Sequence, residues 1–115
     1  MTTTEATTIL TVGARGLGEV REATRAANRH PSPCTDFEHG VLASYRWATA
    51  AQSEAPVTAS TTPDAAGPCR DRLLAECRSA AVKLRVAMHN GTDAGYALGA
   101  YQALAWLCGH HDDHP

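Results

Sequence analysis

The residues best suited to chemistry lie at the end of the sequence. Donor groups of three kinds fall close together there, and they belong to Cys108, His110, His111, Asp112, Asp113 and His114. Thiol, imidazole and carboxylate donors suit Zn²⁺ or another transition metal. Their spacing matches no zinc-site signature, and residues at a terminus are often poorly ordered. We therefore expect 109–115 to form a solvated His/Asp tail without a cofactor. The metal-binding alternative uses Cys108, His110, His111 and His114.

Arginines recur along one side of the first expected helix, where they could bind phosphate groups. Together with one arginine before the helix, the set comprises Arg15, Arg21, Arg25 and Arg29. Glu22 can pair with Arg25 along the same helix, and few aromatic side chains are available to stack on bases. The formal net charge of −2 gives no overall attraction to a polyanion. We expect a solvated helix face, and nucleic-acid binding is a third interpretation.

No pattern in the sequence specifies an enzyme. The glycines within 13–18 lack the Gly-Lys-Ser/Thr ending of a phosphate-binding loop and the spacing of a dinucleotide fingerprint. Asp36 and Glu38 are explained by the start of a helix, which leaves His39 without a catalytic partner. Cys34 precedes that helix, where a thiolate would be stabilised, but the sequence specifies no base beside it. We expect a protein without catalytic activity.

Aromatic side chains indicate a different function, the binding of another protein. The last expected helix carries no charge from 94 to 108, and a single neighbouring helix could not cover all of it. Trp47 lies off the apolar stripe of its own helix, so the sequence does not decide whether its side chain is buried or exposed. Exposed Trp, Tyr and Arg side chains are common anchors of protein interfaces. The predicted contact residues are Arg46, Trp47, Tyr96, Tyr101 and Trp106.

Two helices are predicted in the first half of the chain. The first covers about 17–29 and ends before Pro31, because the residue before a proline avoids the helical conformation. The second begins at Thr35 and Glu38, which fit a capping box. A short strand at 7–12, paired with 56–60, is one alternative, although a frayed arm is the simpler prediction for a Thr-rich segment.

Two more helices are predicted in the second half. The third follows Pro68 and ends at Gly91, which suits the left-handed cap of a helix. The fourth begins with Thr92 as its N-cap and runs to about Cys108. Because the connection between them is so short, they should form an antiparallel hairpin.

Length and composition predict one domain of all-α class. The 115 residues, of which 43% are hydrophobic and 19% charged, suffice for a single core. We expect a small bundle of about four helices over 1–115, with a flexible N-terminal arm at 1–14 and a flexible loop at 55–67. The sequence shows no signal-peptide pattern and no long apolar run. We therefore expect a cytoplasmic protein that does not contact membranes.

One stretch resembles segments of known proteins. Phe37-Glu-His-Gly-Val-Leu-Ala-Ser-Tyr-Arg-Trp-Ala48 and the short segment 55–58 are similar to small uncharacterised helical accessory proteins of phages and mobile elements from high-GC bacteria. The resemblance implies an accessory role, in which the chain binds or inhibits a larger protein. The preferred hypothesis is therefore a non-enzymatic protein–protein interaction module. A homo-oligomer is a further arrangement, because the uncharged fourth helix could be shared between chains.

Overall fold

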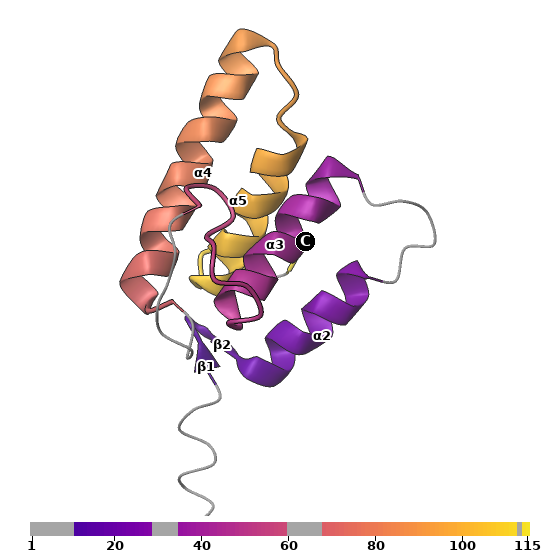
Figure 1. Ribbon diagram of the computed structural model, residues 1–115, viewed down its shortest axis with the longest axis vertical. Coiled ribbons are helices and arrows are strands. Elements are labelled where there is room, and N and C mark those ends of the chain that lie inside the picture. Colours follow the sequence, from indigo (N-terminus) through magenta and orange to yellow (C-terminus); the bar gives the residue numbers. More distant parts are fainter. Residues whose placement is uncertain (1–10, 29–34, 60–67, 113) are drawn as a thin grey trace, which may run out of the picture.

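The computed structural model describes residues 11–28, 35–59, 68–112 and 114–115 (Figure 1). Within these ranges the chain forms four helices and one short pair of strands. The helices are α2 (Leu17–Ala27), α3 (Asp36–Ala48), α4 (Arg70–Asn90) and α5 (Gly95–Leu107), and the strands are β1 (Thr11–Val12) and β2 (Arg15–Gly16). The predicted all-α bundle is confirmed.

Helix α5 lies at the centre of the bundle (Figure 1). It packs against α3 on one side and α4 on the other, and α2 packs on α3. Helices α4 and α5 form the predicted antiparallel hairpin. The absence of charge in α5 is therefore explained within one chain, because neighbouring elements cover nearly its whole C-terminal half.

Local signals set the ends of the helices. At the start of α3 the Thr35 hydroxyl accepts the Glu38 amide at 3.2 Å, and the Glu38 carboxylate accepts the Thr35 amide at 2.9 Å, as the capping box predicts. Gly91 ends α4 with a φ of 70°, which confirms the left-handed cap. The prediction for α5 is wrong in one detail: the Asp93 carboxylate, not Thr92, accepts the Gly95 amide, at 2.9 Å.

The strand pair differs from the predicted one. Strand β1 pairs with β2 rather than with 56–60. The pairing is antiparallel and places Val12 opposite Arg15. Gly13 makes the turn with a φ of 61°, and a Cβ at this position would overlap the carbonyl of Leu107. The Ala14 amide donates to that same carbonyl at 2.8 Å. The strand pair therefore closes the C-terminal end of α5, whose last carbonyls have no partner within the helix.

Helices α3 and α5 meet backbone to backbone. A Cβ on Gly99 of α5 would collide with the carbonyl of Phe37, and a Cβ on Gly40 of α3 would collide with the carbonyl of Tyr96. The spacing of the small residues in α5 would also suit a close approach to its hairpin partner α4. They face α3 instead, because two glycines on facing helices allow an approach that no larger pair permits.

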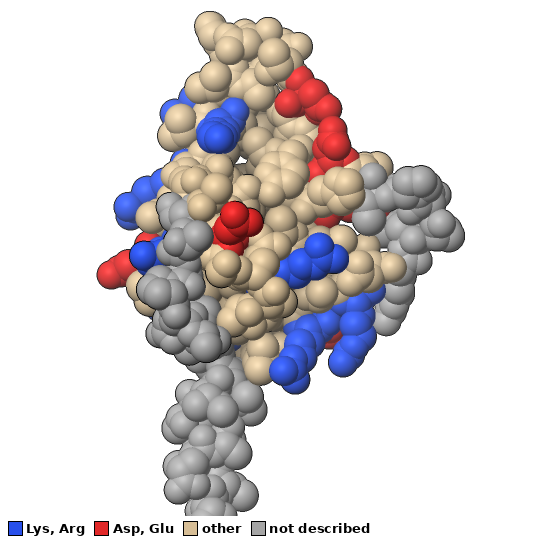
Figure 2. Space-filling model, viewed as in Figure 1, with Lys and Arg blue, Asp and Glu red and all other residues tan. Residues whose placement is uncertain are grey.

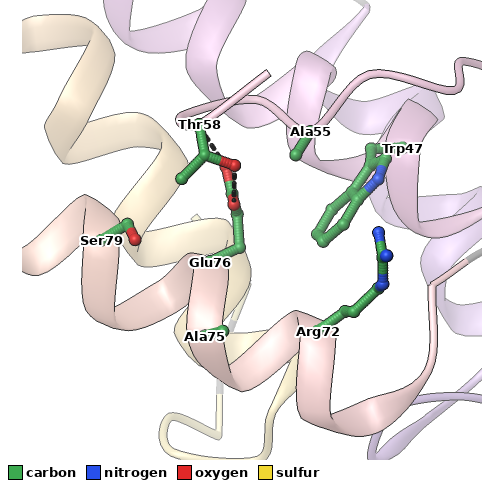
Figure 3. Close-up of a pocket in the computed structure, with 7 residues that line it drawn as sticks. All are labelled: Trp47, Ala55, Thr58, Arg72, Ala75, Glu76 and Ser79. Carbon is green, nitrogen blue, oxygen red and sulfur yellow. Dashed lines mark hydrogen bonds between the residues drawn. The ribbon is translucent and has the colours of Figure 1, made fainter. Parts of the chain in front are cut away.

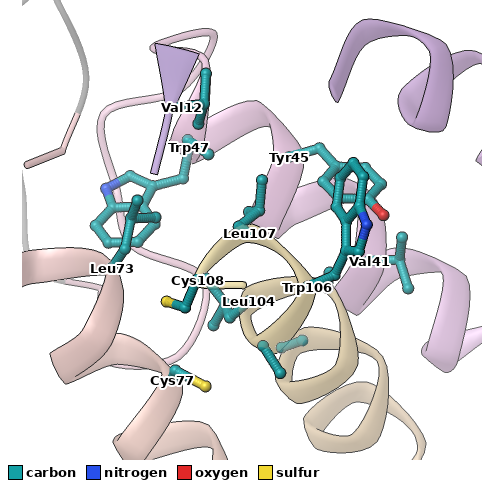
Figure 4. Packing of buried hydrophobic residues seen from close by; sticks show 14 of the residues in the cluster. Val12, Val41, Tyr45, Trp47, Leu73, Cys77, Leu104, Trp106, Leu107 and Cys108 are labelled. Atoms are coloured by element: carbon teal, nitrogen blue, oxygen red, sulfur yellow. The ribbon is translucent and has the colours of Figure 1, made fainter. Parts of the chain in front are cut away.

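The core fills the space that the helices enclose (Figure 4). On α4 the buried apolar side is Leu73, Cys77 and Ala80. Met88, which belongs to the apolar stripe that periodicity suggests, is 69% exposed. The outer half of α4 extends beyond the body of the bundle, and its Val82, Val86 and Met88 side chains are more than half exposed (Figure 1).

Candidate interaction site

Both tryptophans of the predicted contact set are buried. Trp47 is 1% exposed and Trp106 is 3% exposed, so neither can anchor a partner on the folded surface. Trp47 lies beside Leu73 of α4, while Trp106 packs edge to face on Tyr45 with ring centroids 6.0 Å apart (Figure 4). Neither side chain is exposed as an interface anchor would be, because α3 is covered on a wider arc than its apolar stripe suggested and α5 is enclosed between α3 and α4.

The two predicted tyrosines lie at the surface but serve internal contacts. Tyr96 is 38% exposed, and its hydroxyl donates to the Pro56 carbonyl at 2.8 Å. Tyr101 is half-buried and faces the ring of His111, with centroids 6.2 Å apart. Each tyrosine therefore holds a neighbouring segment against α5.

Arg46 is exposed, and it joins two arginines that were predicted for a different function. Arg21 and Arg25 of α2 line one surface cleft with Arg46 of α3. We call this cleft the arginine cleft, and the other described residues that line it are Thr24, Thr49 and Ala51. Figure 2 shows basic side chains gathered over α2 and the neighbouring part of α3. Packing of α2 on α3 thus brings Arg46 beside two arginines that lie at least 21 positions before it in the sequence.

The polar groups of the arginine cleft are arranged to bind an anion. Arg25 pairs with Glu22 at 2.8 Å, whereas Arg21 and Arg46 have no carboxylate partner among the described residues. The Thr24 and Thr49 hydroxyls donate to carbonyls of their own helices at 2.8 and 2.9 Å. The guanidinium groups are then the side-chain donors that remain for a ligand. Guanidinium groups bind carboxylates and phosphates through paired hydrogen bonds.

The other predicted arginines do not extend this cleft. Arg15 donates to the Trp106 carbonyl at 2.9 Å and to the His111 carbonyl, and its guanidinium lies 4.9 Å from the centroid of the Trp106 ring. It therefore joins the strand pair to the end of α5. Arg29 lies outside the described residues.

The predicted metal ligands do not form one cluster in the described part of the chain. Cys108 is buried, whereas His110, His111 and His114 are exposed. The His114 ring packs on Trp106, with centroids 5.5 Å apart, while His111 packs on Tyr101. The described residues contain no group of three or more His, Cys, Asp or Glu side chains that could hold a metal ion. The tail is thus exposed but held against α5 by its rings.

A buried carboxylate that the sequence analysis missed lies in a second cleft, of about 210 Å³ (Figure 3). Glu76 of α4 is 4% exposed, and its carboxylate accepts the amides of Val57 and Thr58 and the Thr58 hydroxyl, the last two at 2.8 Å. The carboxylate therefore fixes 55–59, the described part of the predicted flexible loop. Its position three residues after the buried Leu73 was the signal, because it places an acid on the inner face of α4.

Comparisons with protein-family models, with curated proteins and with solved structures found no match. The resemblance to phage and mobile-element proteins therefore stays a prediction. Among the described residues, no helix combines the length and the apolar character that crossing a membrane requires.

Proposed function

We propose that this protein is a non-enzymatic interaction module, which binds an acidic segment of a partner protein in the arginine cleft. The observation that carries the proposal is the convergence of Arg21, Arg25 and Arg46 on one cleft. Two of these guanidinium groups have no carboxylate partner within the described ranges. An acidic segment would supply these partners and form charge-assisted hydrogen bonds, which are stronger than neutral ones.

A protein partner fits the surroundings of the cleft better than a nucleic acid does. Among the residues that the structure describes, no aromatic side chain lines the cleft, so they offer bases no platform on which to stack. The exposed Glu19 and Glu22 lie on the same helix as two of the arginines and would repel an extended phosphate backbone. A short acidic peptide can avoid these carboxylates, whereas a longer polyanion must pass them.

The accessory role implied by the resemblance is consistent with such a module, since a small chain with one binding cleft can attach to or inhibit a larger protein. That role, the cytoplasmic location and the assembly of more than one chain stay predictions. Transition-metal binding by the tail is the second candidate function, and its support is the number of donor side chains near the C-terminal end of the chain.

The proposal is tested with two labelled probes, a peptide rich in Asp and Glu and a single-stranded DNA. We expect the peptide to bind the full chain, and binding to weaken at least tenfold in Arg21→Glu/Arg46→Glu. Arg85→Glu is the matched control, because Arg85 is an exposed arginine of α4 outside the cleft. Equal loss in the control would show that net charge, not the cleft, attracts the peptide. Preference for DNA over the peptide would favour the nucleic-acid interpretation.

A further inference from the structure

Two buried thiols lie where α4 packs against the end of α5. Cys77 is 4% exposed and Cys108, the C-cap of α5, is 5% exposed. Both are free, and Figure 4 shows their side chains on neighbouring elements of the hairpin. The remaining described cysteine, Cys69, is exposed at the N-cap of α4.

We propose that Cys77 and Cys108 form a redox-active thiol pair, which a peroxide oxidises to a disulfide between α4 and the end of α5. A disulfide needs two Cα atoms within about 7 Å and side chains that face each other. Helix α4 packs against α5, and both thiol side chains lie in the space between these two elements (Figure 4). The proposal does not rest on the arginine cleft.

The surroundings shift the pKa values of the two thiols in opposite directions. The hydrogen bond between the thiols raises the pKa of Cys77, and burial raises it further. The same hydrogen bond lowers the pKa of Cys108, aided by the positive charge of Arg70 and opposed by burial. Cys108 is therefore the more readily ionised of the two thiols, and a thiolate is the nucleophile in thiol oxidation.

The limited access from solvent to Cys77 and Cys108 favours a small oxidant. A surface cleft reaches Cys77 and is lined also by Arg78, Tyr101 and His110. Both sulfur-bearing residues are nearly buried, so a bulky disulfide reagent cannot align with them. Hydrogen peroxide is little larger than water and can enter beside Cys77.

The oxidation needs only the two thiols and one molecule of hydrogen peroxide. The Cys108 thiolate attacks one oxygen of hydrogen peroxide, the O–O bond breaks, and the hydroxide that leaves takes up a proton to become water. The resulting Cys108 sulfenic acid is attacked by the Cys77 sulfur, and its S–O bond breaks as the disulfide forms. The second hydroxide takes the Cys77 proton. Two thiols and one peroxide thus give one disulfide and two waters.

Peptide mapping tests the pairing directly. Trypsin cuts after Arg and Lys, so the four cysteines fall in four different peptides: 30–46, 47–70, 73–78 and 86–115. The reduced full chain is treated with hydrogen peroxide, the remaining thiols are alkylated, and the digest is analysed by mass spectrometry. We expect 73–78 and 86–115 to be joined, with a mass lower by two hydrogens than their sum.

Variants and melting curves complete the test. Cys77→Ala should abolish the joined peptide and leave oxidised Cys108, whereas Cys69→Ala should retain it. Oxidised wild type should melt roughly 10 °C higher than the reduced protein, because the bond constrains the unfolded chain, and a reductant should reverse the shift. The proposal is overturned if both thiols remain open to alkylation or are overoxidised without joining. It is also overturned if they join other cysteines, or if the joined protein melts no higher than the reduced one.

Discussion

A single methyl group tests the contact between α3 and α5. Gly99→Ala would place a Cβ against the carbonyl of Phe37, and neither backbone can move without separating the helices. We expect a loss of about 1–3 kcal/mol in the free energy of unfolding, measured by denaturant titration. The control is Gly18→Ala in α2, where a Cβ meets nothing within 4 Å. This variant should gain about 0.5 kcal/mol, since alanine favours a helix.

Tyr45 carries a buried hydroxyl whose effect on stability a single substitution can measure. Its ring is fully buried, and its hydroxyl has no hydrogen-bond partner among the described residues. Tyr45→Phe removes this polar group while keeping the ring contact with Trp106. We expect the free energy of unfolding to stay equal or to rise by up to about 1 kcal/mol, because burying an unpaired hydroxyl costs stability. A large loss would instead reveal a bonding partner.

The same hydroxyl makes stability depend on pH in alkaline solution. Burial raises the pKa of Tyr45 above its ordinary value of 10.0. Below pH 10 the hydroxyl is neutral in both the folded and the unfolded chain, so stability does not change with its ionisation there. Above this pH the unfolded chain loses the proton while the folded chain keeps it, and stability falls by up to about 1.4 kcal/mol per pH unit. Thermal melts between pH 9 and 11 should show a smaller decline in Tyr45→Phe.

The residues whose surroundings could not be predicted have one thing in common. Trp47, Trp106 and Glu76 occupy helix positions at which periodicity alone does not decide between core and surface. Their burial depends on which helix packs against them, and that information is not local. Cys108 shows the same effect, because its nearness to Cys77 follows from how α5 lies on α4.

Helix ends, by contrast, follow from local chemistry. The capping box of α3 and the Gly91 cap of α4 are properties of a few adjacent residues, so the sequence predicts them correctly. Which faces of two helices pack together, in contrast, depends on residues of both helices. The approach of Gly40 and Gly99 could not be assigned to α3 from spacing alone, since the same small residues would also have suited α4. Likewise, the arginine cleft exists only through the contact of α2 with α3.

The link between α4 and the segment 55–59 gives a prediction for a whole element. Glu76→Gln replaces one acceptor oxygen by a donor, which then faces the amides of Val57 and Thr58. We expect a loss of about 1–3 kcal/mol and faster hydrogen exchange at these two amides. Glu54→Gln, at an exposed position beside the same segment, controls for the change in charge. Equal exchange in both variants would mean that Glu76 does not fix the segment.

At the scale of the whole molecule, the strand pair and the tail meet at the end of α5. Deletion of 110–115 removes the His111 carbonyl that Arg15 binds and the His114 ring that packs on Trp106. We expect a loss of about 1–2 kcal/mol, seen as a lower melting temperature. A tail without contacts would leave the melting temperature unchanged.

A chelator separates this packing effect from metal binding in the same experiment. The packing contacts require no metal, so we expect the tag-free full chain to melt at the same temperature with and without the chelator. If the chelator lowers the melting temperature of the full chain but not that of the truncated one, the tail contributes a bound metal. The metal-binding candidate would then replace the packing explanation.

The contact of Arg15 with Trp106 also bears on the order in which the chain folds during its synthesis. The two residues lie 91 positions apart, and a ribosome releases them in that order. Helices α2 and α3 can form early, but the apolar side of α3 stays open to water until α5 emerges. A nascent chain that stops before α5 therefore presents Tyr45 and Trp47 to chaperones and proteases. Translation speed through the segment that encodes α4 sets how long this exposure lasts.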